Sequence, residues 1–509
     1  MMDAFDRLQA KLIAMWQEIG SSLDERETRA RTIVVVPSLT SDAVEMTSSA
    51  QQAYEERLLF LLFLLRKPNI RLIYVTSQPI QPDIIEYYLN LLPGVVLSNA
   101  RKRLYLVSPE DGSPDSLTEK LLARPALIQH IRDLIPDPNQ THIVPFLTTD
   151  LERELAVKLG IPMYAADPRF FAFGTKSGCR RVFAEENVQH PLGVENLYSV
   201  DALSAAIADM RAQHHAQGQT LDRVVIKLNE GVSGLGNALL DLANLPDPGA
   251  EDEIAAITAR LHTMQFEASD ATYNDYMATL ADAGAIVEEF ITGVAVRSPS
   301  AQLRVSPLGE VEMLSTHDQM LGGPSGQSYL GAIFPANPAY SWLIMRDAAK
   351  IGERFAREGI VGRFAVDFVV VQRADGTWNS YAIEVNLRKG GTTAPFLILQ
   401  YLTDGDYHAE EGIFYTAQGQ PKYYIATDHL EAHAYRTFTT QHLFDLVSDH
   451  RLHFNHATQT GAIMHLITGV AESGRVGVTV IADSPEEANA QYHAFIAVLD
   501  REAALLAQM

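Results

Sequence analysis

The chain has 509 residues, which at roughly 150 residues per domain predicts about three domains. Its formal net charge of −23 at pH 7 excludes general electrostatic binding to nucleic acid or to anionic membranes, so any phosphate site must be a local positive patch. The lone cysteine, Cys179, excludes an intrachain disulfide framework and a cysteine-rich zinc site, and it fits a reducing cytosol.

The start of the chain and its most apolar run both predict helices rather than membrane segments. Residues 1–20 lack the apolar core of a signal peptide and have the spacing of an amphipathic helix. The longest apolar run, Leu58–Leu65 (LLFLLFLL), is far too short to span a bilayer and predicts a buried helix within Gln51–Arg66. We therefore expect a cytoplasmic protein with no membrane or nucleic acid partner, and a homodimer is one option for its assembly.

Residues 30–165 alternate between short β-branched runs and helical stretches. The runs that predict buried strands are Thr32–Val36, Arg71–Ser77, Leu104–Val107 and His142–Leu147. Between them, Asp83–Leu92 predicts a helix, and the Ser116–Glu119 spacing is that of a capping box that begins another. Alternating strands and helices predict a parallel α/β domain over residues 1–166. No G-x-G-x-x-G follows these strands, so dinucleotide binding is unsupported.

From about Asp167 the pattern changes. The predicted elements are a helix from Gly174 to about Glu186, a strand Val224–Leu228, a helix around Glu251–Met264, a strand Ala285–Phe290 and further strands up to Glu384. The last segment has strands, turns and a terminal helix, Ser484–Leu505. We expect domains over 167–405 and 406–509, the latter a small C-terminal α/β cap that shapes a substrate entrance.

The most informative stretch is Tyr381–Phe396, YAIEVNLRKGGTTAPF. Glu384, Asn386 and Arg388 stand at alternate positions, so a strand would place them on one face. A carboxylate and an amide oxygen suit a hard cation such as Mg²⁺, and the arginine suits a phosphate or a developing oxyanion.

A fourth polar residue, Asp367, stands inside the hydrophobic run GRFAVDFVVV. A buried carboxylate is costly unless it is paired or binds a metal. A hairpin turn at Arg373–Gly376 would bring Asp367 beside Glu384 and Asn386, which gives three ligands for Mg²⁺. The alternative is a structural ion pair of Asp367 with Arg363 or Arg388.

Two lysines precede this region. Lys176 stands at a predicted helix start, where the alternative is an ordinary surface lysine. Lys227 ends a β-branched run and is followed by Gly231, Gly234 and Gly236. A glycine loop lets backbone N–H groups approach phosphates, although no G-K-[ST] follows and a Walker A loop is excluded. The alternative is a glycine-rich hairpin.

The predicted strand in the segment AIVEEFITG carries Glu288 and Glu289 near its end, just before a turn near Gly293. Backbone groups at this strand end could hydrogen-bond an adenine, and a carboxylate could bind its amine. The alternative is a solvated strand end.

The order of these elements resembles the ATP-grasp superfamily over roughly residues 167–400. The resemblance implies that Lys176 and Lys227 bind ATP phosphates and that Gly231–Gly236, including Ser233 and Gly234, form the phosphate loop. It also implies an adenine hinge over Glu288, Glu289, Phe290 and Ile291, with Glu288 on the amine. Asp367, Glu384 and Asn386 match the Mg²⁺ ligands, although the superfamily more often has Glu in place of Asp367, and Arg388 matches the arginine that faces an acyl phosphate.

A narrower resemblance covers nearly the whole chain. The segments DPRFFAFGTKSGCRRVF, NLRKGGTTAPF, LQYLTDGDYH and GRVGVTVIADSPEEA are similar to the ATP-grasp peptide ligases of pheganomycin biosynthesis. This resemblance implies an N-terminal α/β pre-grasp domain, an ATP-grasp domain over 167–405 and a C-terminal domain of the peptide-ligase type. Members of that family often carry His where this chain has Ala394.

The resemblance implies an ATP- and Mg²⁺-dependent carboxylate–amine ligase that acts on small-molecule or peptide substrates through an acyl phosphate. The candidate substrate residues are Arg297 and Arg304, which follow the hinge, and Thr392 and Thr393, which follow Arg388. Surface arginines are the alternative for the first two. Two other functions remain: a kinase that phosphorylates an alcohol with the same ATP site, and a non-catalytic nucleotide sensor, which would be expected to lack a metal ligand or a lysine.

Overall fold

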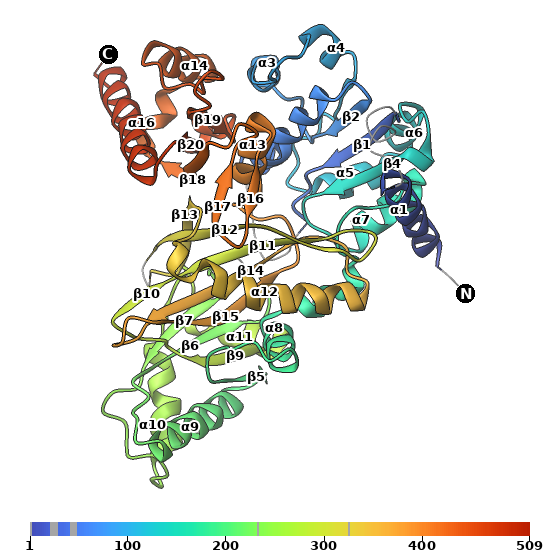
Figure 1. Cartoon of the computed structure of the whole chain (residues 1–509). Coiled ribbons are helices and arrows are strands. Elements are labelled where there is room, and N and C mark those ends of the chain that lie inside the picture. The colour runs from blue at the N-terminus through green and yellow to red at the C-terminus, as the bar shows by residue number, and fades with distance from the viewer. Residues whose placement is uncertain (1–2, 21–28, 41–47, 232–233, 324–325, 509) are drawn as a thin grey trace.

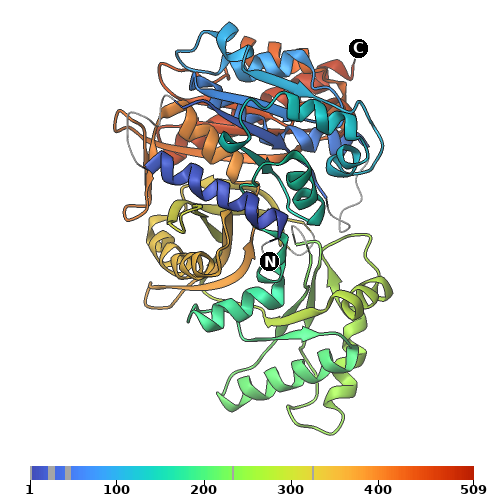
Figure 2. The ribbon, with the colours of Figure 1, turned by 90° about the vertical axis from the view of Figure 1, so that its right-hand side faces the viewer.

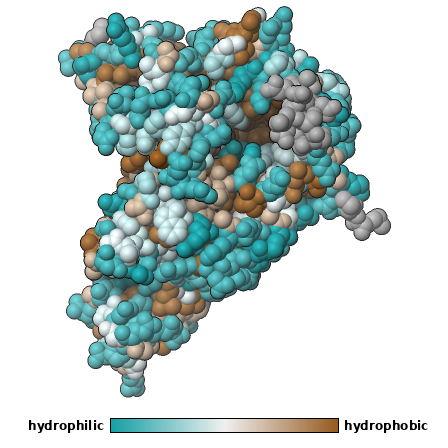
Figure 3. All heavy atoms as spheres, viewed as in Figure 1, coloured by the Kyte–Doolittle hydropathy of each residue, from teal (hydrophilic) through white to brown (hydrophobic). Residues whose placement is uncertain are grey.

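The computed structural model describes residues 3–20, 29–40, 48–231, 234–323 and 326–508. The two ribbon views show the N-terminal and C-terminal parts of the chain side by side at one end, and residues around 190–290 as a lobe at the other end (Figures 1 and 2). The face drawn in Figure 3 is mostly hydrophilic, with small separate apolar patches. No helix in the described residues is long and apolar enough to cross a membrane.

The N-terminal part contains the predicted parallel sheet. Its strands pair in the order β3-β2-β1-β4, all parallel, with bounds β1 (Arg31–Val36), β2 (Ile70–Val75), β3 (Leu104–Val107) and β4 (Thr141–Pro145). One face is covered by α1 (Ala4–Gly20), α5 (Leu117–Leu122), α6 (Pro125–Asp133) and α7 (Asp150–Leu159). The capping box at Ser116 is confirmed: its hydroxyl accepts from the Glu119 amide, and the Glu119 carboxylate accepts from the Ser116 amide.

The other face of this sheet packs on the apolar run, which is buried as predicted. The predicted helix over 51–66 consists of α2 (Ser48–Glu55) followed by a 3₁₀ helix, η1 (Glu56–Arg66). Leu62 and Phe63 of η1 are fully buried in a core that also contains Ile398 and Val478. The N-terminal sheet therefore shares one hydrophobic core with α13 (Thr393–Thr403) and the C-terminal strands.

The lobe opposite the termini is an antiparallel sheet in the order β5-β9-β6-β7-β8. Its strands are β5 (Gly193–Leu197), β6 (Arg223–Leu228), β7 (Asn237–Asp241), β8 (Gln265–Phe266) and β9 (Ala285–Glu289), which confirms the predicted strands at 224–228 and 285–290. Helices α9 (Val200–Ala216), α10 (Glu253–Arg260) and α11 (Tyr273–Ala283) bury its apolar face. Helix α8 (Lys176–Glu185) lies between this lobe and the central sheet (Figure 1).

The central sheet has 11 strands and extends into the C-terminal part. Strands β10 (Ala295–Arg297), β14 (Gly362–Gln372), β11 (Pro299–Val305), β12 (Val311–Gly322) and β13 (Ser328–Phe334) are followed by β18 (Pro421–Glu431), β17 (Ile413–Tyr415) and β16 (Asp406–His408). Strand β15 (Trp378–Asn386) pairs with β14, and β20 (Arg475–Ala482) joins β18 to β19 (Gly461–His465). Helix α12 (Pro338–Glu358) packs on β11 and β12.

The hairpin predicted at 373–376 is confirmed, since the Gly376 amide donates to the Arg373 carbonyl between β14 and β15. In this register Asp367 lies opposite Glu384. The predicted terminal helix is present as α16 (Pro485–Leu506), and Ser484 caps it. The remaining helices are α3 (Pro82–Asn90), α4 (Leu97–Arg101), α14 (Thr440–Asp449), α15 (Gly469–Ser473), η2 (Pro138–Gln140), η3 (Pro168–Gly174), η4 (Leu261–Thr263) and η5 (His433–Thr437).

Candidate active site

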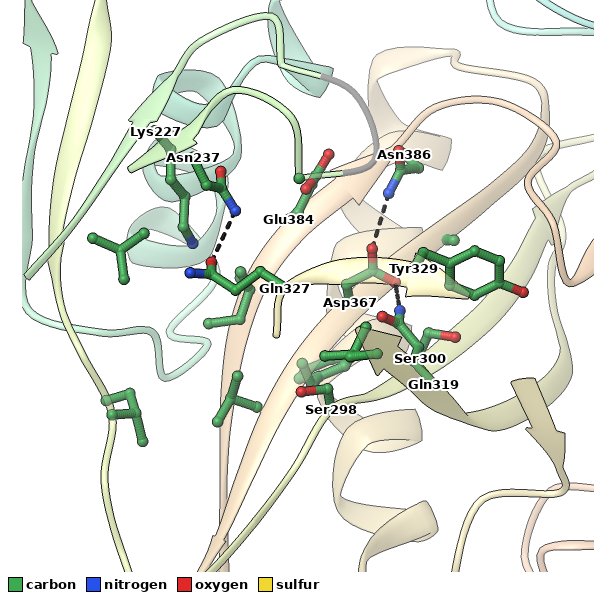
Figure 4. Close-up of a pocket in the computed structure, with 18 of the residues that line it drawn as sticks. Lys227, Asn237, Ser298, Ser300, Gln319, Gln327, Tyr329, Asp367, Glu384 and Asn386 are labelled. Atoms are coloured by element: carbon green, nitrogen blue, oxygen red, sulfur yellow. Dashed lines mark hydrogen bonds between the residues drawn. The ribbon is translucent and has the colours of Figure 1, made fainter. Parts of the chain in front are cut away.

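A cavity of about 390 Å³ lies between the antiparallel lobe and the central sheet (Figure 4). The lobe contributes Lys227, Asn237 and Glu288–Ile291 to its wall, and the central sheet contributes Gln319, Asp367, Glu384 and Asn386. The segment after β15 adds Arg388 and Gly390–Thr392. Thus most of the residues singled out from the sequence face one cavity, although they come from segments as distant as 227 and 392.

The carboxylates of Asp367 and Glu384 form one corner of the cavity. Asp367 accepts a hydrogen bond from Gln319 Nε2 at 2.8 Å and another from Asn386 Nδ2 at 3.1 Å. It forms no ion pair with any described residue, so the structural pair with Arg363 or Arg388 is not present. Burial, followed by the nearby Glu384 carboxylate, raises the pKa of Asp367 to about 7.

This corner fits a divalent cation. Burial raises the pKa of Asp367 first and the adjacent Glu384 carboxylate raises it further, while Lys176 and Arg388 partly oppose the shift, so a bound cation would stabilise the ionised form of Asp367. A half-turn of the Asn386 amide would present its oxygen, in place of its nitrogen, to the same point. Oxygen ligands of this kind suit Mg²⁺. No group of three or more His, Cys, Asp or Glu side chains within the described ranges is arranged for a metal, so a cation at this corner would have two carboxylates and an amide as its candidate protein ligands.

Lys176 is part of this corner and is not a surface lysine. It is the first residue of α8, whose Thr175 side chain caps the helix by accepting from the Gly178 amide. Its ammonium lies 2.6 Å from Glu384 Oε1 and donates to the Gly231 carbonyl at 3.3 Å, and the side chain is only 5% exposed. The lysine therefore connects the metal corner to the start of the glycine loop.

Lys227 belongs to a second buried charge group. Its Nζ lies 2.5 Å from Glu288 Oε2, and Arg180 Nη1 lies 2.6 Å from Glu288 Oε1. Burial favours the neutral acid, yet Lys227 and Arg180 together hold the pKa of Glu288 below its usual range. Glu288 lines the cavity while both of its oxygens are engaged by cations, and its predicted contact with an adenine amine stays a prediction.

The rest of the predicted hinge presents backbone groups and apolar side chains, rather than charged groups, to the cavity. Glu289 Oε1 accepts from the Leu192 amide at 2.8 Å, and Glu289 Oε2 lies 3.1 Å from His214 Nε2. Phe290 and Ile291 line the cavity, and the Phe290 amide donates to the Arg223 carbonyl. An adenine at this end would therefore meet backbone groups and apolar side chains.

The glycine loop joins β6 to β7 and approaches the central sheet. Gly234 has a φ of +84°, and a Cβ built there would lie 2.9 Å from the Gln327 carbonyl oxygen. Gly231 and Gly236 are so close that a Cβ on Gly236 would lie 2.9 Å from the Gly231 Cα. Next to the loop, Asn237 Nδ2 donates to Gln327 Oε1 at 2.9 Å (Figure 4). The predicted loop residue Ser233 lies outside the described residues.

Three of the candidate catalytic and substrate residues, Arg388, Thr392 and Thr393, lie at cavities. Arg388 lines the cavity, and its Nη1 donates to the Lys389 carbonyl at 3.3 Å. Thr392 lines the same cavity, while Thr393 accepts from the Gly390 amide and lines a neighbouring cavity.

The two predicted substrate arginines lie elsewhere. Arg297 is exposed on the short strand β10 and donates to the Val296 carbonyl at 2.8 Å. Arg304 lies near the end of β11 and is paired with Glu312. Neither residue lines the cavity, so the surface alternative describes Arg297, and a structural ion pair describes Arg304.

Several residues of the site were not predicted, among them Gln319, Tyr329 and Arg180. Gln319 holds Asp367, Tyr329 lines the cavity wall, and Arg180 contributes to neutralising Glu288. Arg180 stands four residues after Lys176, so helical spacing could have placed both on one face of α8. Gln319 and Tyr329 lie in the adjacent strands β12 and β13, but Asp367, which Gln319 holds, is 48 residues away in sequence, so no local pattern distinguishes them.

Comparison with known proteins identifies the class. Residues 170–247 and 248–410 match the family of IQCH-like ATP-grasp domains, and residues 442–495 match the PGM1 C-terminal domain family. Residues 170–410 therefore resemble an ATP-grasp domain.

Individual relatives extend the similarity over most of the chain. An L-propargylglycine–L-glutamate ligase of Streptantibioticus cattleyicolor is 28% identical over 87% of this chain and 89% of its own length. An IQ motif-containing protein H of Danio rerio is 23% identical over 79% of this chain, which spans only 41% of that protein.

Solved structures share the fold at low sequence identity. The ADP complex of an N5-carboxyaminoimidazole ribonucleotide synthetase has a TM-score of 0.51 at 13% identity, covering 93% of this chain and 98% of that one. A Campylobacter jejuni biotin carboxylase bound to a β,γ-ATP analogue has a TM-score of 0.53 at 13% identity, covering 94% and 95%. The predicted fold class, an ATP-grasp fold with α/β additions, is confirmed.

Proposed function

We propose that the protein is an ATP- and Mg²⁺-dependent carboxylate–amine ligase of the peptide type. The observation that carries this proposal is the placement of Arg388 beside the Asp367 and Glu384 corner, in the cavity that Lys227 also lines. A cation site and phosphate-binding lysines alone would serve any phosphoryl transfer. A free guanidinium just beyond them suits an acyl phosphate and the oxyanion formed from it.

The reaction has two steps. A carboxylate oxygen attacks the γ-phosphorus of ATP, the bond to the bridging oxygen breaks, and ADP leaves an acyl phosphate. An amine then attacks the acyl carbon, phosphate leaves with the bonding electrons, and the amine loses a proton to give the amide. Mg²⁺ bound by Asp367, Glu384 and Asn386 would supply neutralisation of phosphate oxygens.

The residues of the chain act by position and charge. Lys176 and Lys227, now held by Glu384 and Glu288, would turn toward ATP phosphates with little loss of orientation because both are buried. Arg388 would hold the acyl phosphate and then the tetrahedral oxyanion. The loop Gly231–Gly236, adjacent to Gln327, would shield the acyl phosphate from water.

The relatives support amino-acid-like substrates. One relative that matches most of this chain is named a ligase of L-propargylglycine and L-glutamate, two amino acids joined through an amide bond. We therefore infer small-molecule or peptide carboxylates and amines as the substrates of this chain. A cytoplasmic setting, with its supply of ATP and Mg²⁺, fits the acidic composition and the single buried cysteine.

Hydroxamate formation tests the proposal. L-Propargylglycine and the twenty common L-amino acids are offered as acids with ATP, Mg²⁺ and hydroxylamine, and hydroxamate and ADP are measured. We expect equal amounts of both products from at least one acid. Arg388→Ala should lower the rate by about 100-fold, the usual effect of losing one oxyanion donor. Arg297→Ala, which alters an exposed arginine outside the cavity, is the matched control and should be unchanged. Wild-type activity in Arg388→Ala would contradict the role of Arg388.

A further inference from the structure

A second, smaller cavity lies on the other side of Gly390 and Gly391 from the ATP cavity. Both glycines line both cavities, so they form the shared wall. The remaining wall comes from three parts of the chain: Arg57, Leu58, Phe60 and Phe146 from the N-terminal part, Lys389, Thr393 and Ala394 from the ATP-grasp domain, and Asp428, His465 and Leu466 from the C-terminal part. Its volume is about 20 Å³. That is room for one or two water-sized groups, which is the size of a carboxylate and not of a whole amino acid.

Arg57 is the distinctive residue of this cavity. Its guanidinium stacks on Tyr54 at 3.1 Å from the ring centroid and lies 4.4 Å from the centroid of Phe146. The side chain is only 10% exposed, its Nε is buried without a partner, and it donates no hydrogen bond to any described residue. The nearest carboxylate oxygen, Asp428 Oδ2, is 3.7 Å away, beyond hydrogen-bond distance.

A buried guanidinium with no hydrogen bond is expensive, because five N–H groups have lost their water. Stacking between two aromatic rings fixes the plane of the Arg57 fork, and a fixed planar fork matches a carboxylate through two parallel hydrogen bonds. Arg57 is therefore oriented in advance for a planar anion that no described residue provides at hydrogen-bond distance.

The charge around Arg57 also favours an anion. Asp428 is shared with His429 Nδ1 at 2.7 Å and with Arg475 Nη2 at 3.9 Å. Burial lowers the pKa of Arg57, and although Tyr54 and Asp428 oppose this shift, Arg388 and Arg475 lie close enough to lower the pKa further. The guanidinium groups of Arg57 and Arg475, together with His429, thus share the Asp428 carboxylate, and Arg388 adds a further positive charge near Arg57.

Asp428 reaches the second cavity because the pairing of its strand, β18, is irregular. The pairing of β18 with β20 shifts register between Thr427 and Leu430, so Asp428 and His429 lie in a β-bulge. Bulges redirect side chains and often occur next to functional sites. Here the bulge turns Asp428 toward the second cavity, while the adjoining ring of His429 lies 6.3 Å from that of Tyr329 in the ATP cavity.

We propose that Arg57 binds a carboxylate of the amine substrate, which is therefore an amino acid or a peptide with a carboxylate near its reacting amine. The inference rests on the proposed ligase function. The acid substrate must reach the γ-phosphate beside Asp367 and Arg388 in the ATP cavity. A molecule with its carboxylate on Arg57 would lie on the other side of Gly390–Gly391 from the ATP, so its amine would face the acyl phosphate across these two glycines.

The test compares amines with and without a carboxylate. The acid that gives the most hydroxamate is held constant, and kcat/KM is measured for hydroxylamine, for the amino acid that is the best amine substrate, and for the C-terminal amide of that amino acid. Arg57→Gln should lower kcat/KM for the amino acid by about 10- to 100-fold, the usual range for a hydrogen bond to a charged group. It should change the hydroxylamine rate by less than about twofold, since hydroxylamine carries no carboxylate.

The amide substrate makes the test specific. The wild-type enzyme should prefer the amino acid to its amide by about the same 10- to 100-fold factor, and Arg57→Gln should remove that preference. Arg57→Lys keeps the charge and loses the planar fork, so its preference for the amino acid should lie between those of the wild-type enzyme and Arg57→Gln. It also replaces Arg57→Gln in the test if that variant does not fold. The control is Arg71→Gln, which removes an arginine stacked on Tyr105 far from both cavities.

Three results would overturn the inference. Equal losses with hydroxylamine and with the amino acid would place Arg57 on the acid or on ATP. Unchanged kinetics in Arg57→Gln would exclude a role in substrate binding. A preference for the amino acid over its amide that persists in the variant would show that another group holds the carboxylate. If the wild-type protein makes no hydroxamate from any acid, the ligase proposal itself fails, and this result is separate from the other three.

Discussion

Each lysine that we assign to ATP phosphates is held by a carboxylate. Lys176 contacts Glu384 at 2.6 Å, and Lys227 contacts Glu288 at 2.5 Å. A buried ammonium without a counter-charge would be strongly destabilising. The pairs therefore balance the charge of the two buried lysines and orient their ammonium groups. They also explain why Glu288 remains ionised although it is almost completely buried.

A second buried carboxylate gives a testable pH dependence. Glu56 accepts from the Thr468 amide at 3.2 Å and from the Thr468 hydroxyl, and burial raises its pKa to about 7 from 4.5. The folded protein then holds the proton more tightly than the unfolded chain, so this contribution to stability is present below pH 4.5 and is lost as pH rises through about 7. Complete ionisation would cost about 3 kcal/mol.

Glu56→Gln should therefore become more stable relative to wild type by up to about 3 kcal/mol between pH 5 and pH 8, since glutamine has no proton to lose. Urea denaturation at pH 5, 6, 7 and 8 measures the difference. Glu410→Gln, at an exposed position, is the control and should show a constant difference. A constant difference for Glu56→Gln as well would mean that Glu56 is not perturbed by burial.

At the scale of elements, the glycine loop between β6 and β7 connects the lobe to the central sheet. Gly234 adopts a φ of +84° against the Gln327 carbonyl, whereas Gly249 adopts a φ of +88° with no atom within 4 Å of a built Cβ. Both positions favour glycine for backbone reasons, but only Gly234 also needs the space. The two glycines therefore form a matched pair.

Gly234→Ala should raise KM for ATP by about tenfold. The new methyl group would clash with the Gln327 carbonyl and force the loop away from the central sheet, in addition to the backbone strain that both substitutions cause. Gly249→Ala should leave KM for ATP unchanged and lower the free energy of unfolding by about 1 kcal/mol. ADP release at varied ATP concentrations measures the first effect, and urea denaturation measures the second. Equal KM values in the two variants would show that closure of the loop on the sheet does not matter for ATP.

The sequence predicted the elements better than their packing. Asp367 and Glu384 were placed opposite each other because a hairpin turn fixes the register of neighbouring strands. The four parallel strands followed from local periodicity. The pairing of β13 with β18 and the packing of η1 with β20 in one core depend on contacts between segments far apart in the sequence, which no local pattern encodes. The same limit applies to Arg57, whose importance depends on Tyr54, Phe146 and Asp428 meeting around it.

At the scale of the whole molecule, the C-terminal part is more than a cap. Strand β18 continues the central sheet beside β13, and β20 closes the core that contains η1 and α13. The expected domain boundary at 405/406 therefore crosses a continuous sheet and a continuous core. These contacts also bring the C-terminal Asp428 and the N-terminal Arg57 to the second cavity.

A chain ending at Gly405 should consequently lose cooperative folding altogether. Removal of residues 406–509 exposes the apolar faces of η1 and α13, and β13 loses a paired neighbour. Differential scanning calorimetry should show no cooperative transition, and ATP binding should be lost together with substrate use. A truncated chain that melts cooperatively and still binds ATP would contradict the shared core and would favour a separable cap.

The central claim is that the carboxylate is activated as an acyl phosphate in this cavity. The direct measurement uses the accepted acid labelled with ¹⁸O in its carboxylate, together with ATP, Mg²⁺ and an amine, followed by mass analysis of the released phosphate. The ligase mechanism predicts one ¹⁸O atom in each phosphate, because the attacking carboxylate oxygen stays on phosphorus when the amide forms. Phosphate without ¹⁸O, or a phosphorylated product with no phosphate released, would contradict the mechanism.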